Sequence, residues 1–317
     1  MLRMNEGNAF MLRRFFLALL AVVLCLGVTA ARADSAKLKE FRLGLLGGEN
    51  TQDRLARYNE FQKLLAERLG MPIKLFPAAD YAGVMQAIAA GQLDGAQFSG
   101  SSFAGAWLDC KCIEPVVVPR EKDGSVYYIA VMLVRADSGI KSLQDMKGHS
   151  LAWADPNSTS GYLIPSATLK GMGIKLVDGA YFSKTGFAGG HEQGIISVVN
   201  KQYDAAVTWT SGLGDEAGGY SRGALRTMVD KHMLNMSDIS IIWHSGKIPN
   251  GPWALRSDLP PDLKATFRAF LLDLPTAHPK VYDDVEMGSG VGYAPATMDL
   301  YQDIIDLRLA EQRGNRG

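Results

Sequence analysis

The sequence contains few cysteines and no excess of positive charge. Three of the 317 residues are cysteines. Lysine plus arginine and aspartate plus glutamate number 33 each. A nucleic-acid-binding protein needs many cations to neutralise phosphates, so this balance argues against nucleic acid as a partner. A small anion is still a suitable ligand, because helix ends and backbone N–H groups can hold it without lysine or arginine.

Common enzyme motifs are also missing. The sequence has no G-x-S-x-G elbow, no P-loop, no H-E-x-x-H and no G-x-G-x-x-G. One catalytic triad can be written down, on Ser158 or Ser160, His191 and Asp204. Nothing in the spacing of these residues supports it. We therefore expect neither catalysis nor a cofactor nor a bound metal.

Long apolar segments are confined to the N-terminus. Arg13 and Arg14 precede an almost continuously apolar run over 15–29, and the A-R-A of 31–33 matches a signal-peptidase site. Because the run is short and ends at this site, we predict a signal peptide over 1–33 rather than a membrane anchor. The mature protein is expected in the periplasm.

Export changes the charge and the surroundings of the cysteines. Removing 1–33 takes away four arginines and one glutamate, so the mature chain from Asp34 has three more acidic than basic residues. Cys25 lacks the small preceding residue of a lipid-attachment site. Cys110 and Cys112 would meet an oxidising compartment, where a tight local disulfide is possible. We expect this pair to have no role in function.

Short apolar strands alternate with amphipathic helices, which is the pattern of α/β layers. The helix over 51–69 is the clearest, because Tyr58, Phe61 and Leu65 share one face and Gly70 can end it. The predicted strands are 41–46, 73–76, 93–98, 127–134, 149–154, 181–183, 203–208 and 239–243. The further predicted helices are 80–90, 160–172, 192–199, 260–272 and 298–313.

This alternation predicts two α/β lobes, with the second inserted in the first. Lobe I comprises 34–136 and 245–317, and lobe II comprises 137–244. Two segments, near 135–140 and 242–248, cross between the lobes. A cleft between domains is the usual place for a small ligand.

The stretch D-P-N-S-T-S-G places three hydroxyl groups at the start of a predicted helix. They belong to Ser158, Thr159 and Ser160. One hydroxyl is enough to cap a helix, so three hydroxyls and the N–H groups behind them indicate a site for an anion.

Two further predicted helices start after strand ends. Asp80 can cap the helix that begins with Tyr81, and Gly190 precedes His191. In open α/β sheets ligands bind outside the carboxyl ends of the strands, so these starts are expected to meet in one cleft. Taken singly, each residue has a plainer interpretation as a cap, a packing tyrosine or a surface histidine. Their combination favours the functional interpretation.

Five segments carry a resemblance to a known family: D-Y-A-G (80–83), D-P-N-S-T-S-G (155–161), G-H-E (190–192), N-K-Q-Y-D (200–204) and I-W (242–243). The likeness extends over about 41–263. The sequence resembles the phosphonate-binding periplasmic proteins of ABC transporters, the PhnD family of type II solute-binding proteins. This resemblance implies a two-lobed α/β fold, each lobe a mixed sheet flanked by helices, with a two-segment hinge and no enzymatic activity.

The resemblance also implies roles for individual residues. Ser158, Thr159, Ser160 and His191 match positions that hold phosphonate oxygens, and two tyrosines match cleft positions. The full predicted ligand-binding set is Tyr81, Phe98, Ser99, Tyr128, Ser158, Thr159, Ser160, His191, Ser211 and Asn250.

The match fails where family members that bind aminoalkylphosphonates place acidic residues against the ammonium group. Those positions are Ser211 and Gly251 here, and neither can neutralise a cation. Asn250 could offer an amide oxygen, and Asp215 and Glu216 lie a few residues beyond Ser211. We predict that an amine-bearing phosphonate binds no better than an uncharged one.

The predicted function is the capture of a small phosphorus oxyanion, namely a phosphonate, phosphate ester or phosphite, for delivery to an ABC permease at the membrane. Two alternatives stay open from sequence. They are an exported hydrolase acting on a phosphorus ester in the same cleft, and a ligand sensor for a membrane receptor. The predicted C-terminal helix could pack on the body of the protein or on a second copy.

Overall fold

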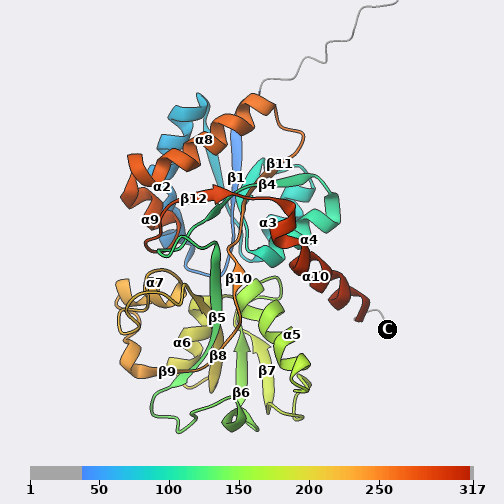
Figure 1. Cartoon of the computed structure of the whole chain (residues 1–317), viewed down its shortest axis with the longest axis vertical. Helices are drawn as coiled ribbons and strands as arrows, with labels where there is room; N and C mark the ends of the chain where they lie inside the picture. Colours follow the sequence, from blue (N-terminus) through green and yellow to red (C-terminus); the bar gives the residue numbers. More distant parts are fainter. Residues whose placement is uncertain (1–37, 315–317) are drawn as a thin grey trace, which may run out of the picture. The chain divides into compact units, whose positions relative to one another are not determined.

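The computed structural model describes residues 38–314. The predicted signal peptide over 1–33, with Cys25 and the cleavage site, lies outside the described residues. Within the described part of the chain, no helix combines the length and the apolar character that a membrane span requires. Residues 39–314 belong to one unit. That unit contains two mixed β-sheets with helices packed on their faces (Figure 1).

The first sheet has the strand order β12-β4-β11-β3-β1-β2. The strand β1 is parallel to β2 and β3, whereas β11 and β12 run antiparallel to their neighbours. The strand bounds are Phe41–Leu45 for β1, Ile73–Pro77 for β2, Gly95–Gln97 for β3, Ile113–Pro119 for β4, Trp253–Arg256 for β11 and Tyr293–Pro295 for β12.

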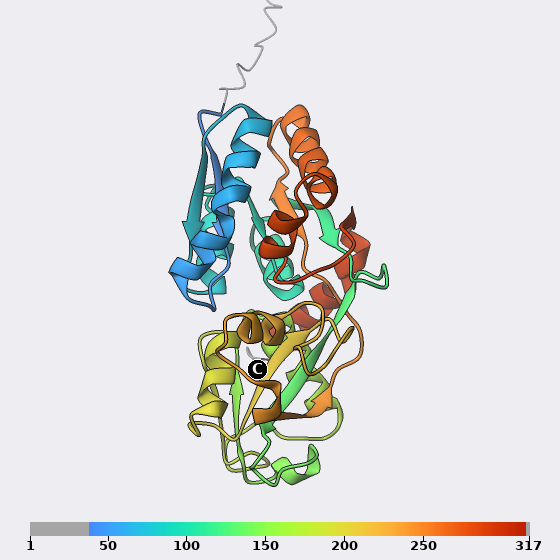
Figure 2. The same cartoon turned by 90° about the vertical axis from the view of Figure 1, so that its left-hand side faces the viewer.

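Helices from both ends of the chain pack around this sheet. The helices α2 and α8 lie side by side (Figure 2), and α10 packs on α4. The C-terminal helix therefore packs on the body of the protein, which was one of its two predicted positions. The helix bounds are Thr51–Leu69 for α2, Tyr81–Ala89 for α3, Gly100–Cys110 for α4, Pro261–Ala277 for α8, Pro279–Val285 for α9, Met298–Tyr301 for the 3-10 turn η4 and Gln302–Gly314 for α10.

The second sheet has the order β10-β5-β8-β6-β7, and β9 pairs with β5. Its strands are Tyr127–Arg135 (β5), Ser150–Trp153 (β6), Lys184–Phe187 (β7), Ala205–Thr210 (β8), Ile239–His244 (β9) and Ile248–Pro249 (β10). The accompanying helices and turns are Gln144–Met146 (η1), Thr159–Leu163 (η2), Ile164–Gly171 (α5), His191–Val199 (α6), Ala224–Asp230 (α7) and Met236–Asp238 (η3).

The strands β5 and β10 differ from the expected division of the chain. The predicted lobe I, with its segments 34–136 and 245–317, includes both, yet β5 pairs with β8, β9 and β10 in the second sheet. The reason is that a strand's local pattern does not specify which sheet its edges join. The predicted strand over 181–183 is also displaced, because the strand β7 begins only at Lys184.

Local capping explains why several helices begin and end where they do. The Asn50 side chain accepts hydrogen bonds from the backbone N–H groups of Gln52 (2.9 Å) and Asp53 (3.2 Å) at the start of α2. Gly70, with φ 66°, ends that helix in the left-handed conformation that glycine adopts without strain. Asp80 caps α3 by accepting from Gly83 N at 2.8 Å. These caps fix the helix starts relative to the strand ends.

Cys110, the last residue of α4, and Cys112 form a disulfide. The local pairing that the sequence left open is therefore present. Among residues 38–314, no group of three or more His, Cys, Asp or Glu side chains is placed to hold a metal ion.

Candidate ligand-binding site

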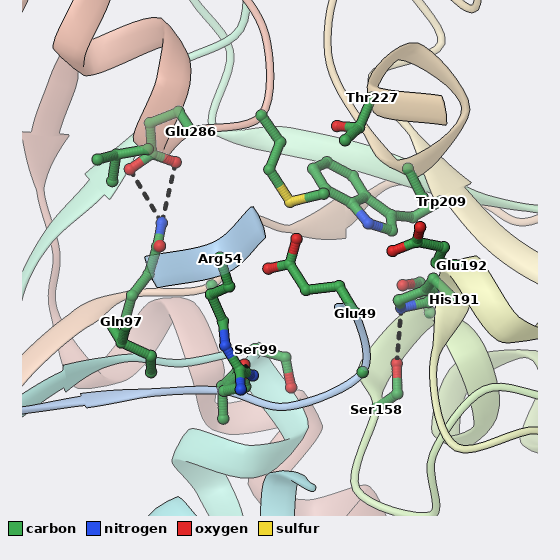
Figure 3. Close-up of a pocket in the computed structure, with 18 of the residues that line it drawn as sticks. Glu49, Arg54, Gln97, Ser99, Ser158, His191, Glu192, Trp209, Thr227 and Glu286 are labelled. Carbon is green, nitrogen blue, oxygen red and sulfur yellow. Dashed lines mark hydrogen bonds between the residues drawn. The ribbon is translucent and has the colours of Figure 1, made fainter. Parts of the chain in front are cut away.

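A cleft is lined by side chains that belong to the layers of both sheets (Figure 3). Its empty space is about 1070 Å³, including the part that is open to solvent. Eight of the ten predicted ligand-binding residues line it: Tyr81, Phe98, Ser99, Tyr128, Ser158, Ser160, His191 and Asn250. Thr159 and Ser211 are not part of the lining.

Four helix starts meet in this cleft. Tyr81 is the first residue of α3, Ser99 is the N-cap of α4, Ser158 is the N-cap of η2 and His191 is the first residue of α6. The starts at Tyr81, Ser158 and His191 were predicted to meet, and Ser99 adds a fourth. No side chain caps α6. Unpaired N–H groups and the helix dipole make such starts favourable for an anion.

We call the group formed by Tyr81, Tyr128, Ser158, Ser160 and His191 the cradle. Ser158 and His191 lie at its centre. Ser158 Oγ accepts a hydrogen bond from Gly161 N at 3.0 Å and lies 3.2 Å from His191 Nε2. Nδ1 of the ring lies 3.3 Å from Thr208 Oγ1. Burial lowers the pKa of His191 to about 4, and a backbone hydrogen bond at Val207 acts in the opposite direction. The ring is therefore neutral at neutral pH.

Two buried tyrosines add phenol groups to the same cradle. Burial raises the pKa of Tyr128 to about 12, although hydrogen bonds with Ser160 and Thr159 oppose this. Burial also raises the pKa of Tyr81, and the charge of Asp155 adds to that shift. Both phenols therefore keep their protons at neutral pH and can donate hydrogen bonds.

Thr159 faces α4 rather than the open cleft. Its side chain is fully buried, and Oγ1 accepts a hydrogen bond from Ser101 N at 2.7 Å. A hydroxyl that accepts one bond still has a proton to donate. Thr159 therefore connects the start of α4 to the loop that carries Ser158 and Ser160.

The positions expected to face a ligand's substituent are used for internal contacts. Ser211 Oγ lies 2.9 Å from Ser221 Oγ, outside the cleft lining. The Asn250 amide oxygen accepts from Arg222 Nη2 at 3.2 Å, and Nδ2 donates to the carbonyl oxygen of Pro119 at 3.1 Å. A Cβ on Gly251 would overlap the carbonyl oxygen of Phe98. The amide oxygen of Asn250 is thus already engaged by Arg222.

Asp215 lies in a turn of its own and not in the cleft. Its carboxylate accepts hydrogen bonds from Ala217 N at 3.2 Å and Gly218 N at 3.1 Å. Neither Asp215 nor Glu216 lines the cleft. The local route by which a carboxylate could reach an amine-bearing ligand is therefore absent from the described cleft.

Six charged residues that the sequence did not indicate also line the cleft: Glu49, Arg54, Arg57, Glu192, Arg222 and Glu286. Glu49 follows the end of β1, so its position after a strand was a usable signal. Glu192 directly follows His191 in the G-H-E segment, which was a second usable signal. The four others have no local signal, because chain segments distant in the sequence bring them together. Figure 3 shows Glu49 pointing into the cavity.

The carboxylates among them already have protein partners. Arg57 binds both oxygens of Glu49, at 2.5 and 2.6 Å. Glu192 lies 3.7 Å from Lys231 Nζ. Glu286 accepts hydrogen bonds from the side chains of Gln97 (2.9 and 3.0 Å), Trp253 (3.0 Å) and Tyr293 (2.7 Å). Glu49 is thus paired with a cation and Glu192 lies near one, whereas the charge of Glu286 is held by neutral donors alone.

Trp209 supplies an aromatic wall to the same region. Its ring lies 5.5 Å from the ring of Tyr128 in an edge-on arrangement. The Arg222 guanidinium lies over it at 5.2 Å from the ring centroid. An aromatic face beside the cradle provides apolar contact for the part of a ligand that carries no charge.

The triad that can be written from the sequence is not assembled. Asp204 accepts hydrogen bonds from Ser150 N and Ser150 Oγ, both at 2.8 Å. His191 instead faces Thr208 and Ser158. The spacing in the sequence gave no support for this triad, and the geometry gives none either.

Comparisons with known proteins show the family of the chain. A family model for the "ABC transporter, phosphonate, periplasmic substrate-binding protein" matches residues 43–301. The chain is 28% identical over 227 residues to the phosphate-import protein PhnD of Mycolicibacterium smegmatis, covering 70% of this chain and 67% of that one. It is 27% identical over 268 residues to the phosphonates-binding periplasmic protein of Escherichia coli, covering 83% and 73%.

A solved structure gives the same result. The binding-protein component of an ABC phosphonate transporter from Pseudomonas aeruginosa has a TM-score of 0.74 and 26% identity, over 87% of each chain. The two-lobed type II fold and the periplasmic location are confirmed. Family membership also supports the prediction that the protein is not an enzyme. The chain belongs to the family of periplasmic substrate-binding proteins of ABC phosphonate transporters.

Proposed function

We propose that the cradle residues Tyr81, Tyr128, Ser158, Ser160 and His191 bind the head group of a phosphonate or related phosphorus oxyanion. The observation that carries this proposal is the meeting of their side chains with four helix starts in one cleft. The donors are hydroxyls, phenols and a neutral imidazole. Fixed dipoles of this kind can replace the water lost by a buried anion.

Thr159 has a supporting place in this proposal. Its oxygen accepts from the first turn of α4, which polarises the hydroxyl and makes its proton a better donor. That proton is available to the Tyr128 phenol, which lines the cleft. The positive end of α4 thereby acts on the ligand indirectly, through Thr159 and Tyr128.

We also propose the division into lobes. Strand pairing supports two lobes that are connected between β4 and β5, over 120–126, and between β10 and β11, over 250–252. These crossings differ from the expected 135–140 and 242–248. They place β5 and β10 in lobe II. The loop that carries Ser158 and Ser160, here called the cradle loop, then belongs to lobe II together with His191. Tyr81 and Ser99 belong to lobe I.

The ligand identity is tested by calorimetric titration with methylphosphonate, ethyl phosphate, phosphite, phosphate and, as a control anion, sulfate. The relative from Mycolicibacterium smegmatis is named as a phosphate-import protein and the one from Escherichia coli as a phosphonates-binding protein. The panel therefore includes both kinds of compound. We expect at least one phosphorus oxyanion to bind and sulfate to bind more weakly. Binding of none of the phosphorus compounds would overturn the proposal.

The cradle is tested with Ser160→Ala and with Ser237→Ala, an exposed serine outside the cleft lining. A hydrogen bond to a charged group contributes about 1.5–3 kcal/mol, so Ser160→Ala should weaken binding at least tenfold. Ser237→Ala should leave the affinity unchanged. Equal affinities in the two variants would show that Ser160 does not contact the ligand.

A further inference from the structure

The C-terminal helix α10 reaches the loop that carries the cradle serines. Arg308 Nη2 donates a hydrogen bond to Asn157 Oδ1 at 3.0 Å, and Nη1 donates to Ser101 Oγ at 3.1 Å. Asn157 directly precedes Ser158, and Ser101 lies in the first turn of α4. One guanidinium thus connects α10, α4 and the cradle loop. Arg308 itself does not line the cleft.

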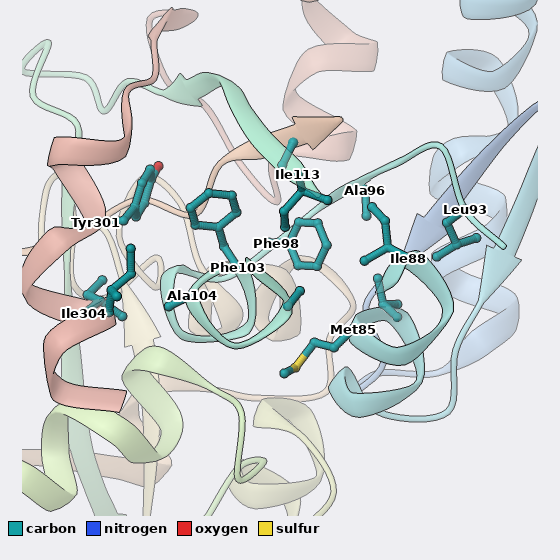
Figure 4. Packing of buried hydrophobic residues seen from close by; sticks show 14 of the residues in the cluster. Met85, Ile88, Leu93, Ala96, Phe98, Phe103, Ala104, Ile113, Tyr301 and Ile304 are labelled. Carbon is teal, nitrogen blue, oxygen red and sulfur yellow. The ribbon is translucent and has the colours of Figure 1, made fainter. Parts of the chain in front are cut away.

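The position of Arg308 is fixed by the packing of α10 and η4 on α4. Tyr301 and Ile304 are buried in the same cluster as Phe103 (Figure 4), and the rings of Phe103 and Tyr301 lie 5.1 Å apart. Because residues four apart share a helix face, Arg308 emerges on the side of α10 that Ile304 packs against α4. The guanidinium is therefore presented from a well-anchored helix.

Gly105 leaves room for this guanidinium on α4. A Cβ at Gly105 would lie 2.8 Å from Arg308 Nη2 and would also overlap Met85 Cε. Glycine inside a helix is less favourable than alanine, so its presence here needs a reason. The close passage of Arg308 and Met85 over α4 supplies one.

Other contacts join the cradle loop to α3 and α4. Ser101 N donates to Thr159 Oγ1 at 2.7 Å and Ser99 Oγ donates to the Asn157 carbonyl oxygen at 3.3 Å, both from neutral groups of α4 and its cap. Tyr81 N, on α3, donates to Asp155 Oδ2 at 3.4 Å. A hydrogen bond from a guanidinium is stronger than a neutral one. Asp155 is also among the acidic groups that attract the Arg308 charge. Arg308 is thus a strong anchor for the cradle loop.

We propose that Arg308 is a positioning residue for ligand binding. It holds Asn157 and thereby fixes the orientation of Ser158 and Ser160 against α4, so that it slows ligand release without touching the ligand. This inference rests on the function proposed for the cradle.

The test compares Arg308→Met with Arg313→Met, an exposed arginine further along the same helix. Methylphosphonate binding is followed by calorimetry and its dissociation by stopped flow, after circular dichroism has verified folding. Arg308→Met should raise Kd about tenfold through faster dissociation, and Arg308→Lys should recover part of the loss. Arg313→Met should behave as the wild type.

A double-mutant cycle isolates the contact itself. Asn157→Ala should weaken binding, and adding Arg308→Met should cause little further loss, because the partner is already gone. Gly105→Ala should weaken binding in the same direction by displacing the guanidinium. An unchanged Kd in Arg308→Met, or fully additive losses in the double variant, would overturn the proposal.

A ligand-free measurement separates this inference from the proposed function. Amide exchange of Ser101, whose N–H is bonded to Thr159, should be faster in Arg308→Met than in Arg313→Met. If the wild type binds neither methylphosphonate nor phosphate, the proposed function fails, while faster exchange would still support the anchoring of the loop. Unchanged exchange would overturn the anchoring role.

Discussion

At the scale of single residues, Thr159 has a structural contribution that can be separated from ligand binding. Thr159→Val removes the acceptor of the buried Ser101 N–H, and an unsatisfied buried donor costs about 1–3 kcal/mol. Thr159→Ser keeps the hydroxyl and loses one methyl group, so it should cost less, about 0.8 kcal/mol. Urea unfolding of the ligand-free variants measures this. Equal losses would show that the hydroxyl has no net structural role.

His191 gives a prediction for the pH dependence of stability. Its folded pKa of about 4 lies below the ordinary 6.5, so between these values the unfolded chain binds a proton that the folded chain does not. Stability contributed by this site is present above pH 6.5 and is lost as pH falls to 4, by about 3 kcal/mol. His191→Gln should lose less stability over this range in urea unfolding.

Burial raises the pKa of Asp155 and Glu121, which opposes the His191 effect. Because the pKa values of these two carboxyl groups are higher in the folded protein than in the unfolded chain, their protonation makes the folded state more stable as pH falls. Both groups are present in the wild type and in His191→Gln, so the comparison of the two proteins removes their contribution. Parallel pH profiles would contradict the lowered pKa of His191.

At the scale of elements, the turn η2 contains Gly161, although alanine has the higher helix propensity. A Cβ at Gly161 would overlap Ala154 and would lie 2.8 Å from Ser158 Oγ and 2.9 Å from His191 Cε1. Gly161→Ala should therefore destabilise the protein and weaken methylphosphonate binding, because the added methyl group displaces the side chains of Ser158 and His191.

Gly171 is the matched control at the end of the following helix, α5. A Cβ there meets nothing within 4 Å, so Gly171→Ala should stabilise the protein by up to about 1 kcal/mol. Thermal melts and calorimetry of both variants measure the difference. A stabilising Gly161→Ala with normal affinity would contradict the packing argument.

The helix starts could be predicted from sequence because their signals are local. Asp80, Asn50 and Ser158 are capping residues next to amphipathic runs, and each caps the helix or turn that follows it. The sequence pattern predicts neither α4 nor β4. The first seven residues of α4 are all buried, so it has no polar face along that stretch, and β4 contains two prolines, which weaken a strand signal.

The candidate site, like the helices and strands, could be predicted where the signal is local. The cradle residues sit next to strand ends and helix starts, and their order along the chain brings most of them to one cleft. Arg222 could not be placed in the same way, because its contact with Asn250 joins segments 28 residues apart. Pairing of β5 with the second sheet likewise depends on strands that are distant in the sequence.

At the scale of the whole molecule, the charged groups of the cleft predict which ligands it accepts. Arg57 holds both oxygens of Glu49, and Glu286 has three donors. An ammonium group entering the cleft would lose its hydration and would have to displace existing hydrogen-bond partners of Glu49 or Glu286. We expect 2-aminoethylphosphonate to bind no better than propylphosphonate, which replaces the ammonium with a methyl group of similar size.

Competition titration with this matched pair measures the preference. A preference for the amine above about tenfold, equivalent to 1.4 kcal/mol, would contradict the prediction. In that case Glu49→Gln should abolish the preference if Glu49 exchanges Arg57 for the ligand. Asp215→Asn, outside the cleft lining, is the control.

The position of Trp209 has a practical consequence. Of the five tryptophans in the sequence, Trp209 lines the cleft, whereas Trp153 and Trp253 are buried. Its indole contacts the Tyr128 ring and the Arg222 guanidinium, so a ligand bound beside it changes the polarity around the indole. Intrinsic fluorescence should therefore report occupancy without a label. Trp209→Phe should abolish the ligand-induced change in fluorescence, while the other four tryptophans still fluoresce.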